Sequence, residues 1–180
     1  MKVNFELNGR AASWNVEPGT TLLDALRAKG IVSVRNGCDG EGSCGLCAVL
    51  LDGKQVNSCQ ILAPQVEGKK VYTVDFYSKD RKLSVVQQAL IDAACVQCGY
   101  CTPAVTLALH ELLERSPDPS GDEVRDALSG TLCRCTGYEQ FFNAARIAAK
   151  RLKEPAYAEA AAPEFAPEFR HVGKDRGKVD

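Results

Sequence analysis

The first half of the chain alternates apolar and polar residues, as strands with one buried face do. Two dipeptides, Asn8-Gly9 and Asp52-Gly53, are typical two-residue hairpin turns. Thr21 and Asp24 are placed to cap a short helix that ends at Gly30. The predicted strands cover residues 3–7, 12–16, 48–51, 55–58 and 71–74. This order predicts a small mixed sheet wrapped over one helix, an α+β domain of residues 1–77.

After a polar linker over residues 75–82, apolar residues recur every three to four positions, the spacing of helices that pack on one face. Signals for a helix start precede four such runs. The signals are Ser84 with Gln87, Thr102 with Pro103, Ser120 with Glu123, and Thr136 with Glu139. The first run extends to about Val96 and the last to about Lys153. The pattern predicts an all-α domain of four helices over residues 83–154.

From Pro155 onward the composition shifts to Ala, Pro and Glu, and the unit Ala-Pro-Glu-Phe occurs twice, at residues 162–165 and 166–169. Such a segment is too polar and too rich in proline to build a core. Two interpretations stay open for residues 155–180. The segment is either an extended or disordered tail, or a docking arm that anchors Phe165 and Phe169 on a partner subunit.

The overall charge is nearly balanced, at −1, and 45% of the residues are hydrophobic. This composition predicts a globular protein without general affinity for nucleic acid or anionic membranes. No stretch approaches the ~20 apolar residues that a membrane-spanning helix needs. The first residues show no signal-peptide pattern. We therefore expect a cytoplasmic protein without membrane insertion.

Nine cysteines need an explanation in such a chain. Disulfides are disfavoured in a reducing compartment, so metal ligation is the better interpretation of so many thiols. The cysteines divide into two sets of four and one spare. The first set is Cys38, Cys44, Cys47 and Cys59, and the second is Cys98, Cys101, Cys133 and Cys135. The spare, Cys95, lies inside a helical run and is interpreted as a small buried hydrophobic residue.

The first set has the spacing C-x5-C-x2-C-x11-C, close to the C-x4-C-x2-C…C of plant-type [2Fe–2S] ferredoxins. Four thiolates, two sulfides and two ferric ions sum to about −2, so the loop must aim backbone N–H groups at sulfur. Glycine gives a loop that freedom, and four glycines lie among these cysteines: Gly37, Gly40, Gly42 and Gly45. Residues 40–45 also match G-x-G-x-x-G, but they lead into a strand instead of a helix, so we reject a dinucleotide site.

The second set is a C-x2-C pair followed, 31 residues later, by a C-x-C pair. The predicted helix starts at Thr102 and Thr136 bring free N–H groups and positive dipole ends toward an anionic centre. Zinc is the main competitor, although C-x-C on a helix cap is less typical of zinc sites. Rieske ligation needs two histidines, and neither His110 nor His171 adjoins a cysteine. We interpret His110, in mid-helix, as a surface or satisfied structural residue.

Six stretches around these cysteines give a more specific signal. They are Gly37-Cys38, residues 42–47, Asp52-Gly53, Ser58-Cys59, residues 97–103 and residues 128–138. Together they resemble the small iron–sulfur subunit of the molybdenum hydroxylases, the xanthine oxidase and aldehyde oxidoreductase family. The resemblance runs from Met1 to about Arg151. It implies one [2Fe–2S] cluster in a β-grasp ferredoxin-like domain and a second in an all-α four-helix domain with pseudo-twofold symmetry.

The resemblance also implies a route for electrons. In the family, substrate is hydroxylated at a molybdenum–pterin centre on a large subunit, and electrons leave singly through the helical-domain cluster and then the ferredoxin-like cluster. They usually end on FAD in a medium subunit. By this resemblance the second cysteine set holds the cluster nearest molybdenum and the first set holds the distal one. Gln97 and Gly99 would approach the pterin, and Cys135 would lie against the pterin amino group.

The implied assembly is a hetero-oligomer with a large molybdopterin-binding subunit and a medium FAD-binding subunit, a dimer of heterotrimers being one arrangement. One spacing departs from the family, because five residues instead of the usual four separate Cys38 from Cys44. Gly40 and Gly42 are positioned to absorb the extra residue as a local bulge. Two other functions stay open: a freestanding two-cluster electron carrier or redox sensor, and a zinc-stabilised interaction module.

Overall fold

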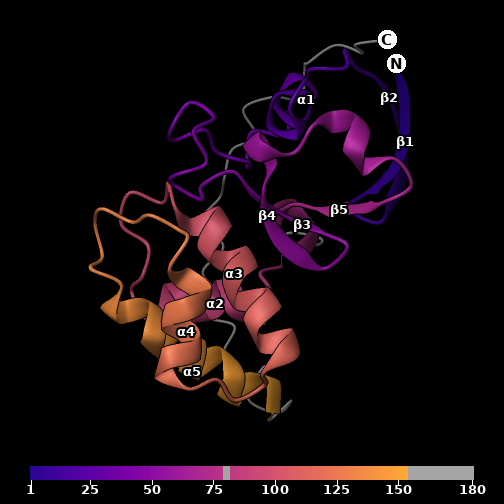
Figure 1. Cartoon of the computed structure of the whole chain (residues 1–180). Coiled ribbons are helices and arrows are strands. Elements are labelled where there is room, and N and C mark those ends of the chain that lie inside the picture. Colours follow the sequence, from indigo (N-terminus) through magenta and orange to yellow (C-terminus); the bar gives the residue numbers. More distant parts are fainter. Residues whose placement is uncertain (79–81, 154–180) are drawn as a thin grey trace.

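The computed structural model describes residues 1–78 and 82–153, which form a sheet part and a helical part (Figure 1). The sheet has five strands in the order β2-β1-β5-β3-β4. The strands are β1 (Lys2–Leu7), β2 (Arg10–Asn15), β3 (Ala48–Leu51), β4 (Lys54–Asn57) and β5 (Lys70–Tyr72). β1 and β5 run parallel, and the other neighbours run antiparallel. The predicted mixed sheet is therefore confirmed.

Both predicted hairpin turns are present. The φ angles are 52° and 79° in Asn8-Gly9, and 50° and 84° in Asp52-Gly53. Positive φ at both central residues gives the two-residue turn whose twist matches that of the paired strands. The turns fix the strand register, which places Val3 and Phe5 on the buried face of β1.

One helix, α1 (Leu22–Ala28), covers one face of this sheet. Its Leu22 and Leu26 are fully buried in a cluster that includes Val49 of β3 and Val71 of β5. Burying each of these side chains stabilises the fold by roughly 1.5–3 kcal/mol. The predicted cap is also confirmed, since the Thr21 hydroxyl accepts a hydrogen bond from a backbone N–H one turn into the helix, at 3.1 Å.

The helical part contains the four predicted helices: α2 (Val85–Asp92), α3 (Thr102–Arg115), α4 (Gly121–Leu128) and α5 (Glu139–Lys153). The capping boxes predicted at Ser84 and Ser120 are both formed. α2 ends at Asp92, before the predicted end near Val96, because Ala94 adopts a φ of 53° that a helix does not tolerate. Within the described ranges, no helix has the length and apolar content that crossing a membrane requires.

Two of the predicted helix starts are wrong in detail. α3 begins at Thr102 itself, after Cys101 as the N-cap, so Thr102 is not a capping residue. α5 begins at Glu139, and the Thr136 hydroxyl bonds to the backbone N–H of Tyr138 instead of capping a helix. Gly137 and Tyr138 have φ of 62° and 69°, which keeps this segment out of the helix.

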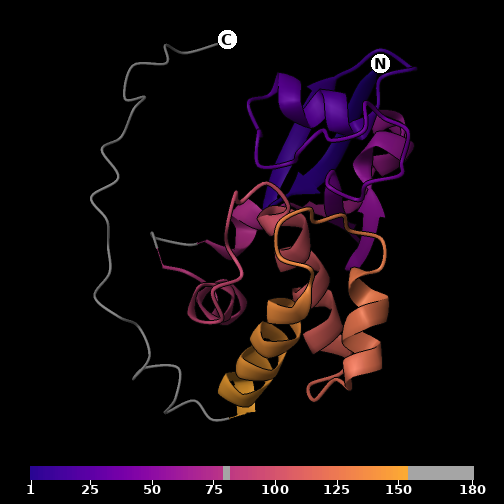
Figure 2. The ribbon, with the colours of Figure 1, turned by 90° about the vertical axis from the view of Figure 1, so that its left-hand side faces the viewer.

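α3 joins the helical part to the sheet. Its Ala104 and Leu107 pack with Ala48 and Leu50 of β3 in one buried cluster, on the opposite side of the strand from the α1 core. β3 is thus buried on both faces, which explains why its sequence is continuously apolar. Figures 1 and 2 show the sheet with α1 above and the helices α2–α5 below. The Glu111 carboxylate of α3 also accepts a hydrogen bond from the β4 backbone, at Gln55 N–H, at 3.0 Å.

The predicted linker over residues 75–82 is partly wrong. Its first residues lie in a 3-10 helix, Val74–Tyr77, that packs on α3. The Tyr77 ring stacks on the His110 ring with centroids 3.7 Å apart, and His110 Nε2 lies 2.9 Å from the Ser84 hydroxyl. These contacts fasten both ends of the connection to one helix, and they confirm the satisfied structural role of His110. The predicted 155–180 tail lies outside the described residues.

Replacing His110 with alanine should destabilise the chain by roughly 1–3 kcal/mol, because the ring stack and the bond to Ser84 are both lost. Burial lowers the pKa of His110 from 6.5 to about 4, so the folded state favours the neutral ring. On acidification His110 is protonated in the unfolded chain before it is protonated in the folded chain. The stabilisation that His110 provides is therefore complete above about pH 6.5 and is lost as the pH falls toward 4. The difference in unfolding free energy between the two proteins should therefore shrink over that range.

Thermal or denaturant unfolding of the intact chain at several pH values measures this effect. Asp126→Ala, on the exposed face of α4, is the matched control and should change stability by less than about 0.5 kcal/mol. A His110→Ala protein as stable as the unmodified chain at pH 7 would show that the stack contributes nothing.

Candidate metal centres

The first cysteine set gathers around the loop between α1 and β3. Cys38, Cys44 and Cys47 lie in this loop, and Cys59 lies in the 3-10 helix Ser58–Gln60 that follows β4. The thiols contact each other in two pairs, Cys38 with Cys44 and Cys47 with Cys59. All except the half-buried Cys38 are buried. The fold therefore places these four thiols in two contacting pairs within residues 38–59, and three of the thiols are buried.

The loop aims N–H groups at these sulfurs, as its glycines predict. Hydrogen bonds from Cys44, with additional ones from Ser43, lower the pKa of the Cys38 thiol to about 6. Burial raises the pKa of Cys44, against hydrogen bonds from the Leu46 and Gly37 backbone. Burial also raises the pKa of Cys47 to about 11. Donors directed at sulfur favour the thiolate form that a metal requires.

The five residues between the first two cysteines form a local turn. The Glu41 N–H bonds to the Cys38 carbonyl at 3.1 Å. Inside this turn Asp39 and Gly40 have φ of 49° and 88°. The Gln60 side chain then fixes the turn by donating to the Gly40 carbonyl at 2.6 Å, and it also donates to Cys59 Sγ at 3.4 Å.

The second set brings together thiols from two separate loops. Cys98 and Cys101 lie immediately before α3, and Cys133 and Cys135 lie between α4 and α5. Again the thiols pair, Cys98 with Cys135 and Cys101 with Cys133. The first pair is exposed, while Cys101 is buried and Cys133 half-buried. One end of this site therefore faces solvent in the isolated chain.

In the less exposed pair of the second set, Cys101 and Cys133, hydroxyl groups contact Cys133. Burial raises the pKa of Cys133, but hydrogen bonds from Thr136 and its neighbours outweigh burial and the net shift is downward. The Thr136 hydroxyl lies 3.1 Å from Cys133 Sγ. The Tyr138 hydroxyl accepts the Cys133 N–H at 2.8 Å and donates to the Thr131 carbonyl at 3.0 Å. Burial raises the pKa of Cys101 to about 12.

Pairing by twos fits a two-iron cluster better than a single ion. A [2Fe–2S] cluster takes two protein ligands on each iron, whereas structural zinc needs four ligands around one point. Each cysteine set thus has the arrangement that could hold a [2Fe–2S] cluster.

The two cysteine sites meet at a tight joint between the sheet part and the helical part. The Leu132 N–H bonds to the Cys44 carbonyl at 2.9 Å. A Cβ atom on Gly45 would lie only 1.9 Å from the Gly130 carbonyl oxygen. In Figure 1 the purple loop after α1 lies beside the loops that precede α3 and α5. Cys44 of the first set is therefore in direct backbone contact with Leu132, the chain neighbour of Cys133 in the second set.

A second contact supports the joint. The Tyr100 hydroxyl donates to the Asn36 carbonyl at 2.7 Å, and the Arg35 guanidinium lies 5.5 Å from the Tyr100 ring centroid. Sequence reasoning missed this joint, because most of its partners are backbone atoms that residue identity does not reveal. The only signal was Gly45, whose φ of 68° and missing side chain allow the close approach.

The other predicted site residues lie at the exposed end of the second set. Gln97 is exposed and Gly99, with a φ of 77°, is half-buried. Three large hydrophobic residues within two positions of a cysteine of this set along the chain are exposed: Val96, Tyr100 and Leu132. The approach of Gln97, Gly99 and Cys135 to a pterin stays a prediction. Cys95 is buried and its thiol contacts the Gln140 carbonyl at 3.1 Å, which confirms its structural interpretation.

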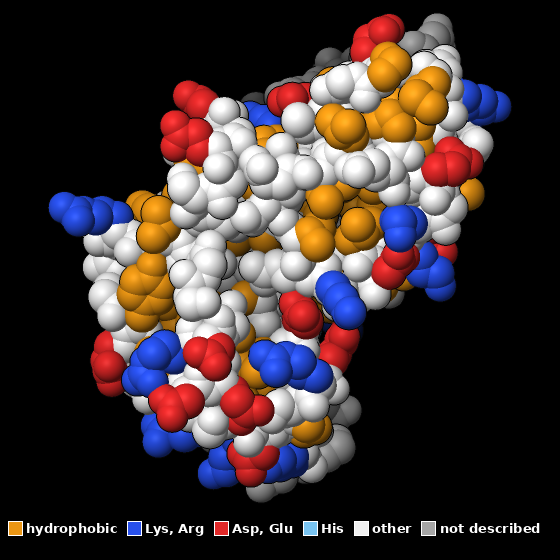
Figure 3. All heavy atoms as spheres, viewed as in Figure 1, with side chains coloured by type: hydrophobic (Ala, Val, Ile, Leu, Met, Phe, Trp, Pro, Cys, Tyr) orange, Lys and Arg blue, Asp and Glu red, His pale blue; other side chains and the backbone are white. Residues whose placement is uncertain are grey.

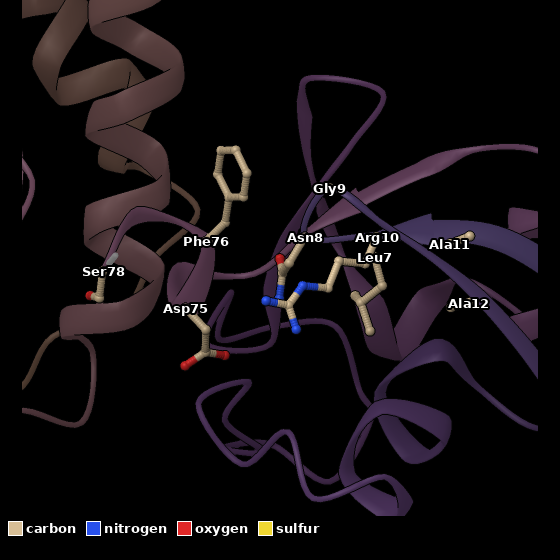
Figure 4. A pocket seen from close by; sticks show the side chains of 9 residues that line it. All are labelled: Leu7, Asn8, Gly9, Arg10, Ala11, Ala12, Asp75, Phe76 and Ser78. Atoms are coloured by element: carbon tan, nitrogen blue, oxygen red, sulfur yellow. The ribbon is translucent and has the colours of Figure 1, made fainter. Parts of the chain in front are cut away.

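A hollow of about 710 Å³ lies elsewhere, between the β1–β2 turn and the 3-10 helix Val74–Tyr77 (Figure 4). Arg10 and Asp75 line it from these two segments, and none of its lining residues is a cysteine. The Asp75 carboxylate is already bound by the Ser33 and Thr73 hydroxyls. The hollow is therefore separate from both cysteine sites.

The surface in Figure 3 carries acidic and basic side chains mixed over the helices at its lower end. A single-sign field, such as one that attracts nucleic acid, is absent from that face.

Comparisons with known proteins agree with this geometry. The model of the 2Fe-2S iron-sulfur cluster binding domain matches residues 5–73, and that of the [2Fe-2S] binding domain matches residues 73–146. The chain is 44% identical over 150 residues to the nicotinate dehydrogenase small FeS subunit of Eubacterium barkeri, covering 83% of this chain and 95% of that subunit.

Two further relatives point the same way. The chain is 42% identical over 143 residues to the xanthine dehydrogenase iron-sulfur-binding subunit of Escherichia coli O157:H7, covering 78% and 89% of the two chains. A chain of quinoline 2-oxidoreductase from Pseudomonas putida 86 matches with a TM-score of 0.81 and 38% identity, covering 85% of this chain and 96% of that one. This protein belongs to the family of small [2Fe–2S] subunits of the molybdenum hydroxylases.

Proposed function

We propose that this chain passes single electrons from a molybdopterin centre on a large partner subunit, through two [2Fe–2S] clusters, to FAD or another acceptor. The observation that carries the proposal is the 2.9 Å hydrogen bond from the Leu132 N–H to the Cys44 carbonyl. Leu132 is the neighbour of Cys133 in one set, and Cys44 belongs to the other. A short bonded route thus links the two cysteine sites through the protein itself.

We assign all eight paired cysteines as cluster ligands, the first set to the distal cluster and the second to the cluster nearest molybdenum. When bound, each cluster supplies a centre that accepts and releases one electron. The protein supplies the N–H and O–H groups directed at Cys38 and Cys133, which stabilise negative charge on sulfur. Burial of Cys44, Cys47 and Cys101 keeps water from the sulfurs.

The exposed end of the second set is the side we assign to the large subunit. Gln97, Gly99 and Cys135 lie there and would face the pterin, with molybdopterin and FAD both carried by partners. The exposed Val96, Tyr100 and Leu132 favour a subunit over a freestanding carrier, because a carrier does not need apolar side chains around its electron entry. We infer a hetero-oligomer, with a heterotrimer or a dimer of heterotrimers as its form.

Purification from the native source tests the function. The chain should bring along a large partner that contains molybdopterin, and it should contain about four irons and four sulfides, two of each per cluster. Recovery of the chain at full yield without a partner would support the freestanding carrier instead. A colourless protein with about two zinc ions per chain would contradict the assignment of iron–sulfur clusters.

A further inference from the structure

Thr131 differs from the other fully buried hydroxyl residues of this fold. Its side chain is completely buried, yet its hydroxyl oxygen has no hydrogen-bond partner in residues 1–78 and 82–153. The others, Ser58, Thr73 and Thr106, each donate to a protein oxygen at 2.7–2.9 Å. A buried hydroxyl without a partner is rare enough in folded proteins to indicate a group that the polypeptide alone does not provide.

The backbone on both sides of Thr131 is fixed at the joint between the cysteine sites. The Gly130 carbonyl lies against Gly45, and the Leu132 N–H bonds to the Cys44 carbonyl. The Thr131 carbonyl itself accepts the Tyr138 hydroxyl, which in turn accepts the Cys133 N–H. Thr131 therefore cannot rotate its backbone to bring the hydroxyl to solvent.

Burial alternates along this segment. Thr131 is buried, Leu132 is 56% exposed and Cys133 is half-buried. Such alternation is typical of an extended segment, in which residues two apart share a side. Thr131 and Cys133 are thus both turned away from solvent, whereas Leu132 is turned toward it.

We propose that the Thr131 hydroxyl donates a hydrogen bond to a sulfur atom of the cluster held by Cys98, Cys101, Cys133 and Cys135, and thereby raises its reduction potential. The inference rests on the proposed function, because it requires a cluster at this site. Anionic sulfur is the acceptor that the orphaned hydroxyl lacks, and hydrogen bonds to the sulfurs are among the factors that set the potential of such clusters. The reduced cluster has one more negative charge, so the bond stabilises the reduced form more than the oxidised form.

The test is the substitution Thr131→Val in the complete loaded complex, because valine keeps the shape of threonine and replaces only the hydroxyl, with a methyl group. A redox titration followed by electron paramagnetic resonance should show one cluster becoming harder to reduce. We expect about a tenfold smaller equilibrium constant for its reduction, equivalent to about 59 mV for a one-electron centre. In D₂O, pulsed measurements on the reduced unmodified complex should detect exchangeable deuterons coupled to that cluster, including that of the Thr136 hydroxyl near Cys133 Sγ, and the valine variant should lose one of these couplings while the others remain.

Two variants separate a hydrogen bond from a packing effect. Thr131→Ser retains the hydroxyl and should keep both the potential and the deuteron coupling. Thr106→Val removes an equally buried hydroxyl that already donates to the Thr102 carbonyl, and it should leave both potentials unchanged.

An unchanged potential in Thr131→Val, an equal shift of both clusters, or a shift confined to the cluster of the first set would overturn the inference. Failure of the proposed function would look different, because the unmodified complex would then give no pair of [2Fe–2S] signals at all.

Discussion

Replacing Cys135 with serine is expected to remove or severely perturb the cluster of the helical part while the signal of the other cluster stays intact. Cys135 is paired with Cys98 at the exposed end of the second set, so its loss deprives one iron of a thiolate. The first set draws all its thiols from the loop after α1 and from the segment after β4, and none of them is touched. The iron content should fall from about four to about two per chain.

Electron paramagnetic resonance of the reduced protein, together with iron analysis, measures both clusters at once. Cys95→Ser is the matched control, because Cys95 lies in the same part of the fold and is not among the paired thiols. We expect it to retain both signals. Loss of both signals in Cys135→Ser would show that the two sites fold as one unit, and two unchanged signals would refute the ligand assignment.

Substituting Gly45 with alanine is expected to break the joint between the two sites. The added Cβ would lie 1.9 Å from the Gly130 carbonyl oxygen and 3.1 Å from Thr131 Cα. Both are backbone atoms, so the overlap can be relieved only by moving the whole segment. Overlap of this size, added to a positive φ of 68°, should destabilise the chain by roughly 3 kcal/mol or more. Relief by separation would stretch the Leu132–Cys44 hydrogen bond, so the magnetic interaction between the two reduced clusters should weaken.

Gly40→Ala is the control for this substitution. Gly40 lies in the same loop and has a φ of 88°, but a Cβ there would meet nothing within 4 Å. It therefore has the backbone penalty alone, about 1–2 kcal/mol. Thermal unfolding and the spectrum of the reduced protein should both distinguish the two variants. Equal losses would mean that the joint is unimportant and that only the loop conformation matters.

These two expected results concern different requirements of electron transfer. The cysteine pairs decide whether a centre is present, and the joint decides whether two centres are held at a fixed separation. Gly45 serves the second requirement although it lies between Cys44 and Cys47 of the first set. A substitution there is therefore expected to leave the ligands in place and still impair transfer between the sites.

The features predicted well were those that depend on neighbouring residues in the chain. The turns at Asn8-Gly9 and Asp52-Gly53 formed as expected, because their residues tolerate positive φ whatever surrounds them. The caps at Ser84 and Ser120 also formed, since each capping box spans only four residues. Local chemistry was sufficient in these places.

Two features were predicted poorly, because another contact replaced the one that the sequence pattern indicates. Thr136 matches a helix cap, but its hydroxyl binds Cys133 Sγ and the Tyr138 N–H instead. The polar linker after β5 reads as a loop, but Tyr77 stacks on His110 from α3 and orders it. At Thr136 the cause is local, since positive φ at Gly137 and Tyr138 keeps the segment out of the helix. The Tyr77 contact instead joins two segments that are far apart in the chain, which a sequence pattern does not reveal.

The sequence alone therefore determined the chemistry of this protein: two sets of four thiols, a glycine-rich loop that directs N–H groups at sulfur, and two sets of elements to hold them. Spacing carries much of that information because the cysteines occur in short motifs, C-x5-C-x2-C, C-x2-C and C-x-C, and the turns are local. Only the tertiary structure decided how the sets meet, through Leu132 with Cys44 and Gly45 with Gly130. These contacts join backbone atoms about ninety residues apart, and backbone atoms are the same in every residue, so only packing selects which of them touch.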